Sequence, residues 1–359
     1  MRIIQMLPDI YFGDAVGNDT LALKHLISES GYETEIYAER IDSRLPKGTA
    51  LPLKELSQIN KDDIIISHVS TASPINQWIK KQICKKVMVY HNITPPEFFN
   101  NYSNAHVTGC KTGYDEVKKL QETFDMVLAV SAYNRQNLLD MGYNCPIHVL
   151  PILIPFDDYK KSPSKETISK YKDDGFTNII FVGRIAPNKC QQDVIGAFYE
   201  YQKYYNKKSR LFIVGNPIGL ETYDEQLKNY ANKLGVQNVI FTGHIKFDEI
   251  LAYYYLSDLF LCQSEHEGFC VPLVEAMFFN KPIVAYDSSA IGWTLGGSGF
   301  LMKEKNPLET AAVMNRILTD NELKETMLAN QRERLADFQY DKVKALFWKY
   351  MDDFIGNEK

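Results

Sequence analysis

Short apolar runs alternate with amphipathic stretches along most of the chain. Apolar runs of about four to eight residues between turn signals indicate buried strands, and apolar positions at helical spacing indicate helices. In the first half this pattern predicts strands at residues 2–7, 33–38, 63–68, 86–91, 126–131 and 148–153. Helical stretches such as 19–31 and 132–142 lie between them, which indicates a parallel sheet covered on both faces.

A second series of the same kind begins near residue 178 and continues through residues 210, 238, 259 and 282. The stretch 155–175 between the two series is rich in charged residues and contains two prolines. Linkers between domains have this composition. We therefore expect an α/β protein with a first domain at residues 1–156, a second domain at 157–340 and a C-terminal helix at 341–359.

The amino-acid composition limits the kinds of partner that the protein is expected to bind. The chain has 359 residues, of which 45% are hydrophobic and 24% charged, as in ordinary globular proteins. Residues 1–156 contain 15 basic and 17 acidic side chains and the remainder 25 and 28, for a net charge of −5. This balance argues against nucleic acid as a partner. The densest basic cluster suits either an anionic membrane surface or a solvated helix face; it consists of Lys80, Lys81, Lys85 and Lys86.

The six cysteines are scattered and form no C-x-x-C pair, which fits reduced thiols. The chain opens on a predicted strand where a secretory signal would need its apolar core, and no apolar run approaches the roughly 20 residues of a spanning helix. We expect a cytoplasmic protein. Any membrane contact would be peripheral, at the inner face of the cell membrane.

The stretch 267–275 places two carboxylates around a glycine turn and a proline. Residues 259–264 resemble a buried strand and 272–279 a helix with Pro272 at its first position, so Glu267 lies in the loop and Glu275 about one turn into the helix. Both carboxylates then face the crevice beyond the strand. The backbone amides at the start of this helix suit a phosphate; they belong to Gly268, Phe269, Cys270 and Val271.

Carboxylates beside an anion are suited to accept hydrogen bonds from neighbouring hydroxyls, and a nucleotide sugar offers hydroxyls on both sides of a diphosphate. The alternative is that Glu275 offsets the helix dipole while Glu267 is a solvated loop charge.

Two cations follow the first strand of the second series. Arg184 lies at the carboxyl end of the strand at 178–183, and Lys189 precedes a helix that we expect to begin near Gln191. Cations at a strand end beside a helix amino terminus form an anion site. A pair of solvated loop charges is the alternative.

Several of these segments together resemble one family. The Glu267-x7-Glu275 spacing resembles the E-x7-E signature of retaining glycosyltransferases of family 4. Residues 181–189 resemble the G-R-x4-K phosphate-binding element of that family, and residues 89–92 resemble its strand that ends in an active-site histidine. The resemblance is best over residues 176–320. It implies the GT-B fold, in which two Rossmann-like, doubly wound α/β domains face a central cleft.

In the resembled family a terminal helix returns to the first domain, which is the expectation for residues 341–359. A surface helix on the second domain is the alternative. The family also binds its donor on the second domain and its acceptor on the first.

The resemblance implies roles for individual residues. Glu267 would orient the donor sugar and Glu275 the ribose, while Arg184 and Lys189 would stabilise the departing diphosphate. Many glycosyltransferases hold a divalent metal there with a D-x-D motif. That motif is absent from this sequence, so we expect neither metal nor cofactor.

His91 would hydrogen-bond a hydroxyl of the donor sugar near its reacting carbon. The alternative is a structural histidine at a strand end. His68 also ends a predicted strand and resembles it in this respect. Asn216 and Ile245 follow strands of the second series, and the resemblance places them near the phosphates and the base.

The loop at residues 12–19 matches the family loosely. Gly17 would allow close approach of the backbone to a ligand. Asp14, Asn18 and Asp19 are candidates for contact with an acceptor hydroxyl. Alternatively, these side chains cap the first helix and meet solvent.

These expectations describe a retaining, metal-independent hexosyltransferase. Its donor would be a UDP- or GDP-sugar carrying mannose, glucose, galactose or an N-acetylhexosamine. Its acceptor would be a hydroxyl of a polysaccharide, of the O-antigen of lipopolysaccharide, of a capsule or of a glycolipid. Two alternatives stay open: a nucleotide-sugar epimerase of the same architecture, which needs no acceptor, and a non-catalytic subunit that binds a sugar nucleotide.

Overall fold

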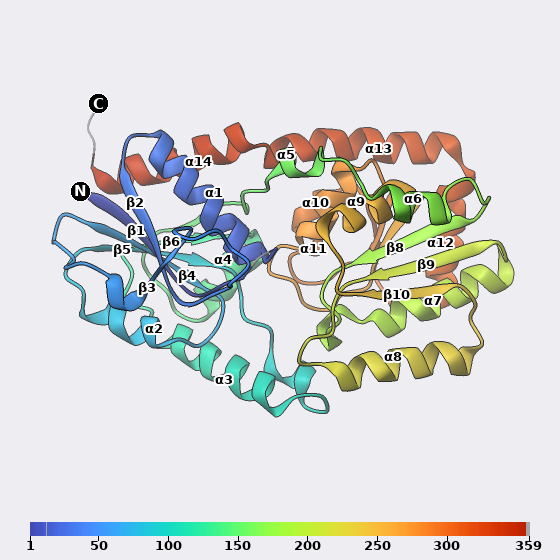
Figure 1. Cartoon of the computed structure of the whole chain (residues 1–359), viewed down its shortest axis with the longest axis horizontal. Coiled ribbons are helices and arrows are strands. Elements are labelled where there is room, and N and C mark those ends of the chain that lie inside the picture. The colour runs from blue at the N-terminus through green and yellow to red at the C-terminus, as the bar shows by residue number, and fades with distance from the viewer. Residues whose placement is uncertain (12, 357–359) are drawn as a thin grey trace. The chain divides into compact units, whose positions relative to one another are not determined.

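The computed structural model describes residues 1–11 and 13–356, which form two compact units (Figure 1). Unit 1 comprises Met1–Glu97, Ala105–Pro155 and the segment from Asp337 onward. Unit 2 comprises Phe98–Asn104 and Phe156–Ala336. Most of unit 2 is therefore inserted between two parts of unit 1.

The sheet of unit 1 has seven strands within the described residues, in the order β3-β2-β1-β4-β5-β6-β7, and every pair is parallel. The strands are β1 (Arg2–Ile10), β2 (Glu33–Ile41), β3 (Leu51–Pro52), β4 (Ile64–Val69), β5 (Lys85–Tyr90), β6 (Met126–Ala129) and β7 (Ile147–Val149). The helices of this part are α1 (Ala15–Glu29), α2 (Pro74–Trp78), α3 (Asn104–Lys118), α4 (Ala132–Asp140) and α14 (Tyr340–Ile355). Short 3-10 turns of this unit are η1 (Leu53–Glu55) and η2 (Ile79–Lys81), whereas η3 (Pro96–Phe99) and η5 (Ala336–Phe338) each span a boundary between the units along the chain.

The sheet of unit 2 has six described strands in the order β10-β9-β8-β11-β12-β13, again all parallel. The strands are β8 (Thr177–Val182), β9 (Ser209–Val214), β10 (Val239–Gly243), β11 (Leu259–Cys262), β12 (Ile283–Tyr286) and β13 (Phe300–Met302). The helical segments are α5 (Phe156–Tyr159), α6 (Lys165–Tyr171), η4 (Pro187–Lys189), α7 (Gln191–Tyr204), α8 (Glu221–Leu234), α9 (Phe247–Leu256), α10 (Val271–Phe278), α11 (Ile291–Leu295), α12 (Pro307–Thr319) and α13 (Asn321–Leu335).

Both sheets reverse their strand order once, where β4 lies beside β1 and β11 beside β8. Strands of a sheet covered on both faces are apolar throughout, and β4 and β9 are buried along their whole length. The predicted fold class, with two Rossmann-like doubly wound sheets, is confirmed. In such sheets, ligands bind beyond the carboxyl ends of the strands at the reversal.

The first helix begins earlier than the sequence pattern predicts, at Ala15 instead of residue 19. The reason is Asp14, whose Oδ2 accepts a hydrogen bond from the Gly17 N–H at 3.1 Å and caps the helix. Asn18 and Asp19 therefore lie inside α1, so the alternative in which one of them caps the helix is wrong.

Two further boundaries differ. The last strand of the first half ends at Val149 instead of residue 153, because Pro151 has no N–H to donate to a sheet ladder. In α10, Pro272 occupies the second helical position and not the first. Cys270, with a left-handed backbone at φ 72°, is the N-cap, so Val271 is the first helical residue.

Helix α14 packs on unit 1, where Figure 1 shows it in red alongside α1 in blue. Its buried face consists of Val343, Phe347 and Met351. The Trp348 ring stacks on Tyr32, just after α1, with 5.2 Å between ring centres. The Tyr340 hydroxyl donates to a Glu29 oxygen in α1 at 2.7 Å. The last helix thus contributes to the core of the first unit.

The basic cluster found in the sequence does not lie on one helix face. Lys80 and Lys81 end η2, whereas Lys85 and Lys86 begin β5. The Lys85 ammonium donates to the Phe354 carbonyl at 2.6 Å, where it complements the negative carboxyl end of α14. Among the described residues, no helix has both the length and the apolar character needed to cross a membrane.

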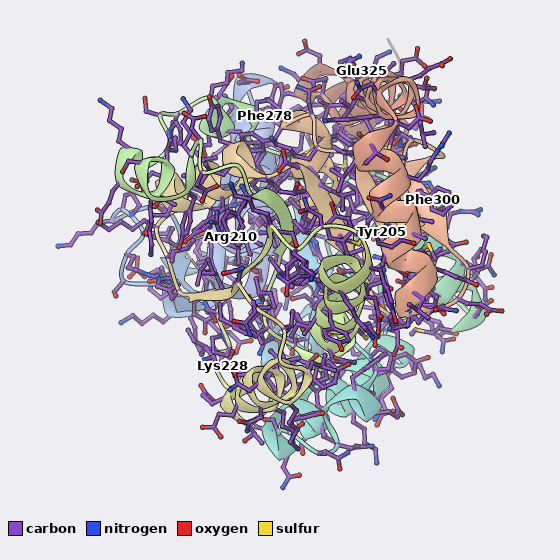
Figure 2. All side chains as sticks on the ribbon, turned by 90° about the vertical axis from the view of Figure 1, so that its right-hand side faces the viewer. Tyr205, Arg210, Lys228, Phe278, Phe300 and Glu325 are labelled. Atoms are coloured by element: carbon purple, nitrogen blue, oxygen red, sulfur yellow. The ribbon has the colours of Figure 1, made fainter. Side chains whose placement is uncertain are left out.

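A buried arginine fixes the amino end of the unit 2 sheet. Arg210, labelled in Figure 2, lies at the start of β9, and its guanidinium pairs with Asp174 at 2.5 Å. The same guanidinium lies 4.7 Å from the ring centre of Tyr171 and 4.5 Å from that of Phe176. These contacts hold the segment before β8 against the sheet.

Candidate active site

Unit 2 brings the loop between β11 and α10 against the loop after β8. The Asn188 side chain donates to the His266 carbonyl at 3.0 Å, and the Asn188 carbonyl accepts from the Glu265 N–H at 2.8 Å. From the β12 side, the Ser289 hydroxyl accepts from the Glu267 N–H at 2.8 Å. The loop that carries Glu267 is therefore held on two sides.

Two of the predicted site residues form a direct ion pair. Lys189 Nζ donates to Glu267 Oε2 at 2.5 Å, and the side chains are 22% and 7% exposed. Burial is the largest influence and acts to lower the pKa of Lys189, but the Glu267 carboxylate, with smaller contributions from Cys270 and Cys262, raises the pKa overall. Lys189 thus stays protonated. An ammonium has three N–H donors, and Glu267 accepts from one of them.

The ends of β8 and β9 approach so closely that glycine is required. A Cβ atom at Gly215 would lie 1.9 Å from the Gly183 carbonyl oxygen, far inside van der Waals contact. Gly215 also pairs with Gly243 at the end of β10. Asn216 directly follows this contact, and Ile245, half-buried, follows Gly243 by two residues. The structure therefore gathers the predicted loops of β8, β9 and β10 at one sheet edge.

Arg184 lies exposed at the carboxyl end of β8, as the sequence predicts. Its guanidinium donates to the Ile218 carbonyl at 3.4 Å, and its own carbonyl accepts from the Gln191 side chain at 2.9 Å. The neighbouring Ile185 N–H donates to the Asn216 carbonyl at 3.0 Å. Arg184 is thus tied to the Asn216 loop, whereas Lys189 is tied to Glu267.

The turn from Gly268 to Val271 leads directly into α10. Its N-cap, Cys270, adopts the left-handed conformation that non-glycine residues rarely take. Phe269 is buried against Trp293, and its carbonyl accepts from the Thr294 hydroxyl at 2.5 Å. The first amides of a helix lack intrahelical acceptors, so this fixed turn presents the donors that an anion needs.

Glu275 has partners that the sequence did not predict. Its Oε1 accepts from the Tyr159 hydroxyl at 2.8 Å, and its Oε2 accepts from the Tyr254 hydroxyl at 2.7 Å. Burial raises the pKa of the Glu275 carboxyl, and the two tyrosine hydroxyls partly oppose this rise. Each carboxylate oxygen has a second acceptor site, so these bonds leave capacity for a ribose hydroxyl. No acidic residue lies in the first turn of α10, which removes support for a role of Glu275 at the helix dipole.

In unit 1, His91 belongs to a buried polar cluster at the strand reversal. His68 Nδ1 lies 3.0 Å from His91 Nε2, and His68 Nε2 lies 3.0 Å from the Gln5 side-chain oxygen. An Asp19 oxygen lies 3.9 Å from His91 Nε2. The other Asp19 oxygen accepts from the Leu153 N–H at 2.8 Å. Burial raises the pKa of Asp19 to about 7 and lowers that of His91 to about 3.

The remaining candidates of the first loop lie at the start of α1. Asp14 is the N-cap, and burial raises the pKa of its carboxyl against the opposing backbone hydrogen bonds. Gly17 is buried in the first turn, where a Cβ would meet the Tyr11 carbonyl at 3.1 Å. Asn18 is half-buried beside it. Of the three acceptor candidates, the structure brings Asp19 next to His91.

Three clusters of described residues hold ligand atoms close enough for one metal ion: Asp19 with His68 and His91, Cys262 with Glu267 and Cys270, and Cys190 with Asp193 and Glu265. In both clusters of unit 2 a lysine already supplies the positive charge. Lys189 pairs with Glu267, and Lys305 pairs with Asp193 at 2.7 Å and Glu265 at 2.8 Å.

Sequence reasoning missed four side chains around these candidates: Gln5, Ser289, Tyr159 and Tyr254. Gln5 had a signal, since it is a polar residue within an otherwise apolar run. The tyrosines had none, because they lie 116 and 21 residues from Glu275.

Residues 164–334 match the model of a family described as Glycosyl transferases group 1. Over 243 residues the chain is 23% identical to the GDP-mannose-dependent α-(1-6)-phosphatidylinositol monomannoside mannosyltransferase of Mycobacterium tuberculosis, a match that covers 64% of this chain and 62% of that protein. The chain spans about half to three fifths of the length of the first curated relatives it matches.

Two solved structures extend the likeness to the whole chain. Sucrose-phosphate synthase from Thermosynechococcus elongatus has a TM-score of 0.75 at 16% identity and covers 100% of both chains. HepE from Anabaena, in complex with UDP and glucose, has a TM-score of 0.73 at 18% identity and covers 98% of this chain and 100% of its own. At such identities the likeness shows the fold. Residues 164–334 thus match the group 1 glycosyl transferase model, within a chain of GT-B fold.

Proposed function

We propose that this chain is a retaining, metal-independent hexosyltransferase that moves a hexose from a UDP- or GDP-sugar to a hydroxyl of a polysaccharide or glycolipid. The family match over residues 164–334 supports glycosyl transfer as the class of reaction. The observation that carries the proposal is the ion pair between Lys189 and Glu267 at the amino terminus of α10.

The roles follow from the chemistry of these groups. Negative charge accumulates on the diphosphate as the bond to the sugar breaks. The protonated Lys189 and the amides at the start of α10 would stabilise that charge. Arg184, exposed at the end of β8, would add a second cation. These groups supply the positive charge that a metal ion provides in other enzymes.

Glu267 and Glu275 would bind hydroxyls on either side of the diphosphate. Glu267 lies in the loop before α10, where it would accept a hydrogen bond from the sugar. Glu275 has acceptor capacity left beside Tyr159 and Tyr254 for the ribose. His91 would bind a hydroxyl near the reacting carbon. Retention of configuration rests on the resemblance of residues 267–275 to the E-x7-E signature.

Related proteins favour two donor classes. The mycobacterial relative is GDP-mannose-dependent, and HepE was solved with UDP and glucose. Mannose and glucose are therefore the hexoses to test first. The same mycobacterial protein acts on a phosphatidylinositol monomannoside, which makes a glycolipid acceptor a reasonable starting point.

The test is a donor panel. UDP-, GDP- and ADP-hexoses are incubated with the wild-type chain in the presence of a chelator, with glycolipid and oligosaccharide acceptors, and nucleotide release is measured. We expect release from one nucleotide class, and an α-linked product by proton NMR from an α-linked donor. Glu267→Gln should lower this rate about 100-fold or more, because the sugar loses an ionised acceptor.

Lys303→Gln is the matched control, since Lys303 pairs with Asp287 on the surface with 76% of its side chain exposed. Inversion of configuration, or strict need for a divalent ion, would contradict the proposed mechanism. Conversion of one nucleotide sugar into another without nucleotide release would indicate an epimerase. Donor binding without turnover of any donor in the panel would indicate a binding subunit.

A further inference from the structure

The cluster around His91 is a chain of three side chains from neighbouring strands. Gln5 lies in β1, His68 in β4 and His91 directly after β5, and the register places these strands side by side. All three side chains are held within unit 1. The side chain of His91 is 3% exposed, and Gln5 and His68 are buried. A buried chain of this kind has few ways to arrange its protons.

The two rings meet edge to edge. Their planes differ by 20° and their centres lie 5.4 Å apart, while the facing nitrogens lie 3.0 Å apart. The distance between the ring centres exceeds the distance between the nitrogens by 2.4 Å, which is about the sum of the two distances from a ring centre to its nitrogen. Both nitrogens therefore lie close to the line that joins the ring centres. Imidazoles that share a metal ion point their lone pairs at the ion and not at each other. This geometry fits a hydrogen bond between the rings.

The Gln5 side chain determines which ring nitrogens of His68 and His91 carry protons. Its side-chain oxygen only accepts, so His68 Nε2 carries a proton and His68 Nδ1 is a bare acceptor. His91 Nε2 must then be the donor to His68, which leaves His91 Nδ1 without a proton. Burial and His91 lower the pKa of His68, and burial lowers that of His91 to about 3, so both rings are neutral.

If the oxygen and nitrogen of the Gln5 amide were exchanged, the amide nitrogen would donate to His68 Nε2. The protonated and bare nitrogens of both rings would then be reversed. Asp19 decides against the reversal. Its nearer oxygen lies 3.9 Å from His91 Nε2, and above the Asp19 pKa of about 7 the ionised carboxylate is favoured next to an N–H and disfavoured next to a lone pair. His91 Nδ1, by contrast, is buried and has no hydrogen-bond partner among residues 1–11 and 13–356. A buried acceptor without a partner costs free energy that a ligand hydroxyl would recover.

We propose that Gln5 and His68 are positioning residues that hold His91 in the Nε2–H tautomer, so that Nδ1 accepts a hydrogen bond from a hydroxyl of the donor sugar. The identity of the ligand rests on the proposed function, whereas the tautomer does not. Because His91 Nδ1 can only accept, it favours a ligand group that donates a hydrogen bond. A sugar that lacks the hydroxyl leaves Nδ1 unpaired.

The test uses the full chain labelled with 15N in its histidine rings. Long-range proton–nitrogen spectra distinguish protonated from bare ring nitrogens, and the His91 signals are assigned by their loss in His91→Asn. We expect a protonated Nε2 and a bare Nδ1 in the wild-type chain. His68→Leu should mix or reverse the two states, because the acceptor is gone. His68→Asn, whose amide oxygen still accepts, should keep the wild-type pattern.

His25→Gln is the control, since the exposed His25 pairs with Glu29 and should leave the His91 signals unchanged. A protonated Nδ1 in the wild-type chain would overturn the proposal, even if His68→Leu did not fold. Unchanged His91 signals in a folded His68→Leu chain would overturn it as well.

Activity supplies an independent readout once a donor is known. We expect His68→Leu to lower kcat/KM about tenfold, which corresponds to about 1.4 kcal/mol for one hydrogen bond, and His68→Asn to restore it. If no donor is turned over while the tautomer is as expected, the proposed function fails and the positioning role stands. If a donor is turned over and His91 Nδ1 is protonated, only the positioning role fails.

Discussion

The two units hold polar groups at equivalent places, near the strand ends where the sheet order reverses, but they hold them in opposite ways. In unit 2, Lys189 and Glu267 pair as opposite charges, and the pKa of Lys189 is raised despite its burial. In unit 1, burial keeps His68 and His91 neutral. The comparison teaches that burial alone does not decide ionisation. A partner of opposite charge at hydrogen-bond distance acts against the effect of burial.

The contacts that hold these polar groups in place also differ between the two units. The unit 2 loops rest on backbone contacts, of which the approach of Gly215 to Gly183 is the tightest. The unit 1 cluster rests on side-chain hydrogen bonds between strands. Substitutions should therefore disturb the two regions through different mechanisms.

The largest effect is expected from removing the positive charge of Lys189 in unit 2. Lys189→Met should lower kcat/KM for nucleotide release about 100- to 1000-fold, because the departing diphosphate loses a preorganised cation and Glu267 is left without its partner. Initial rates at saturating and limiting donor give the measurement. Lys303→Met, at an exposed surface pair, should keep the wild-type rate. A Lys189→Met rate close to wild type would mean that the ion pair only stabilises the loop.

The backbone support of unit 2 should be the next most sensitive. Gly215→Ala should lower the free energy of unfolding by about 3 kcal/mol, because its Cβ has no room beside the Gly183 carbonyl. Urea unfolding followed by circular dichroism measures this. Gly196→Ala in α7 is the control. Its Cβ would meet the Tyr230 hydroxyl at an ordinary 3.4 Å, and alanine favours the helix. Equal unfolding midpoints for the two variants would contradict the close approach.

A smaller effect is expected on the pH dependence of the free energy of unfolding, through the buried titratable groups of unit 1. The folded-state pKa of Asp19, about 7, lies above the unfolded value of about 3.9, so its contribution to stability is full below about pH 4 and is lost as pH rises towards 7. The depressed pKa values of His68 and His91 act the other way, and their contribution is lost as pH falls below about 6.5. The two trends oppose each other in the wild-type chain.

Asp19→Asn removes the first trend and keeps an oxygen that can accept from Leu153. The free energy of unfolding of this variant should therefore rise between pH 4.5 and 7 by about 3 kcal/mol more than that of the wild type. Urea midpoints across this pH range provide the measurement. Parallel curves for both proteins would show that Asp19 does not hold its proton in the folded chain.

The sequence predicted the strands well, because buried parallel strands are apolar throughout and stand out from amphipathic helices. It also predicted that Lys189 and Glu267 belong to one site, which the ion pair supports. The boundaries of some elements were predicted less accurately. The start of α1 depended on whether Asp14 or a later side chain caps the helix, and several residues in that loop are suitable caps.

What the sequence did not reveal are contacts between residues distant along the chain. Tyr159 meets Glu275 across 116 positions, and no local pattern encodes such a pair. His68 and His91 both end strands, so sequence alone left them as rivals. The strand order of the sheet makes them neighbours, and that order emerges only when the chain is folded.

The return of the chain to unit 1 has a consequence for its synthesis. Residues 156–336 emerge from the ribosome before α14 does, yet α14 supplies Phe347 and Met351 to the core of unit 1. Unit 2 can complete its sheet while the first unit still lacks its last helix. The nascent protein therefore carries an unfinished, apolar surface on unit 1 until residue 351 has left the ribosome, and chaperone contact during this interval should be directed at that unit.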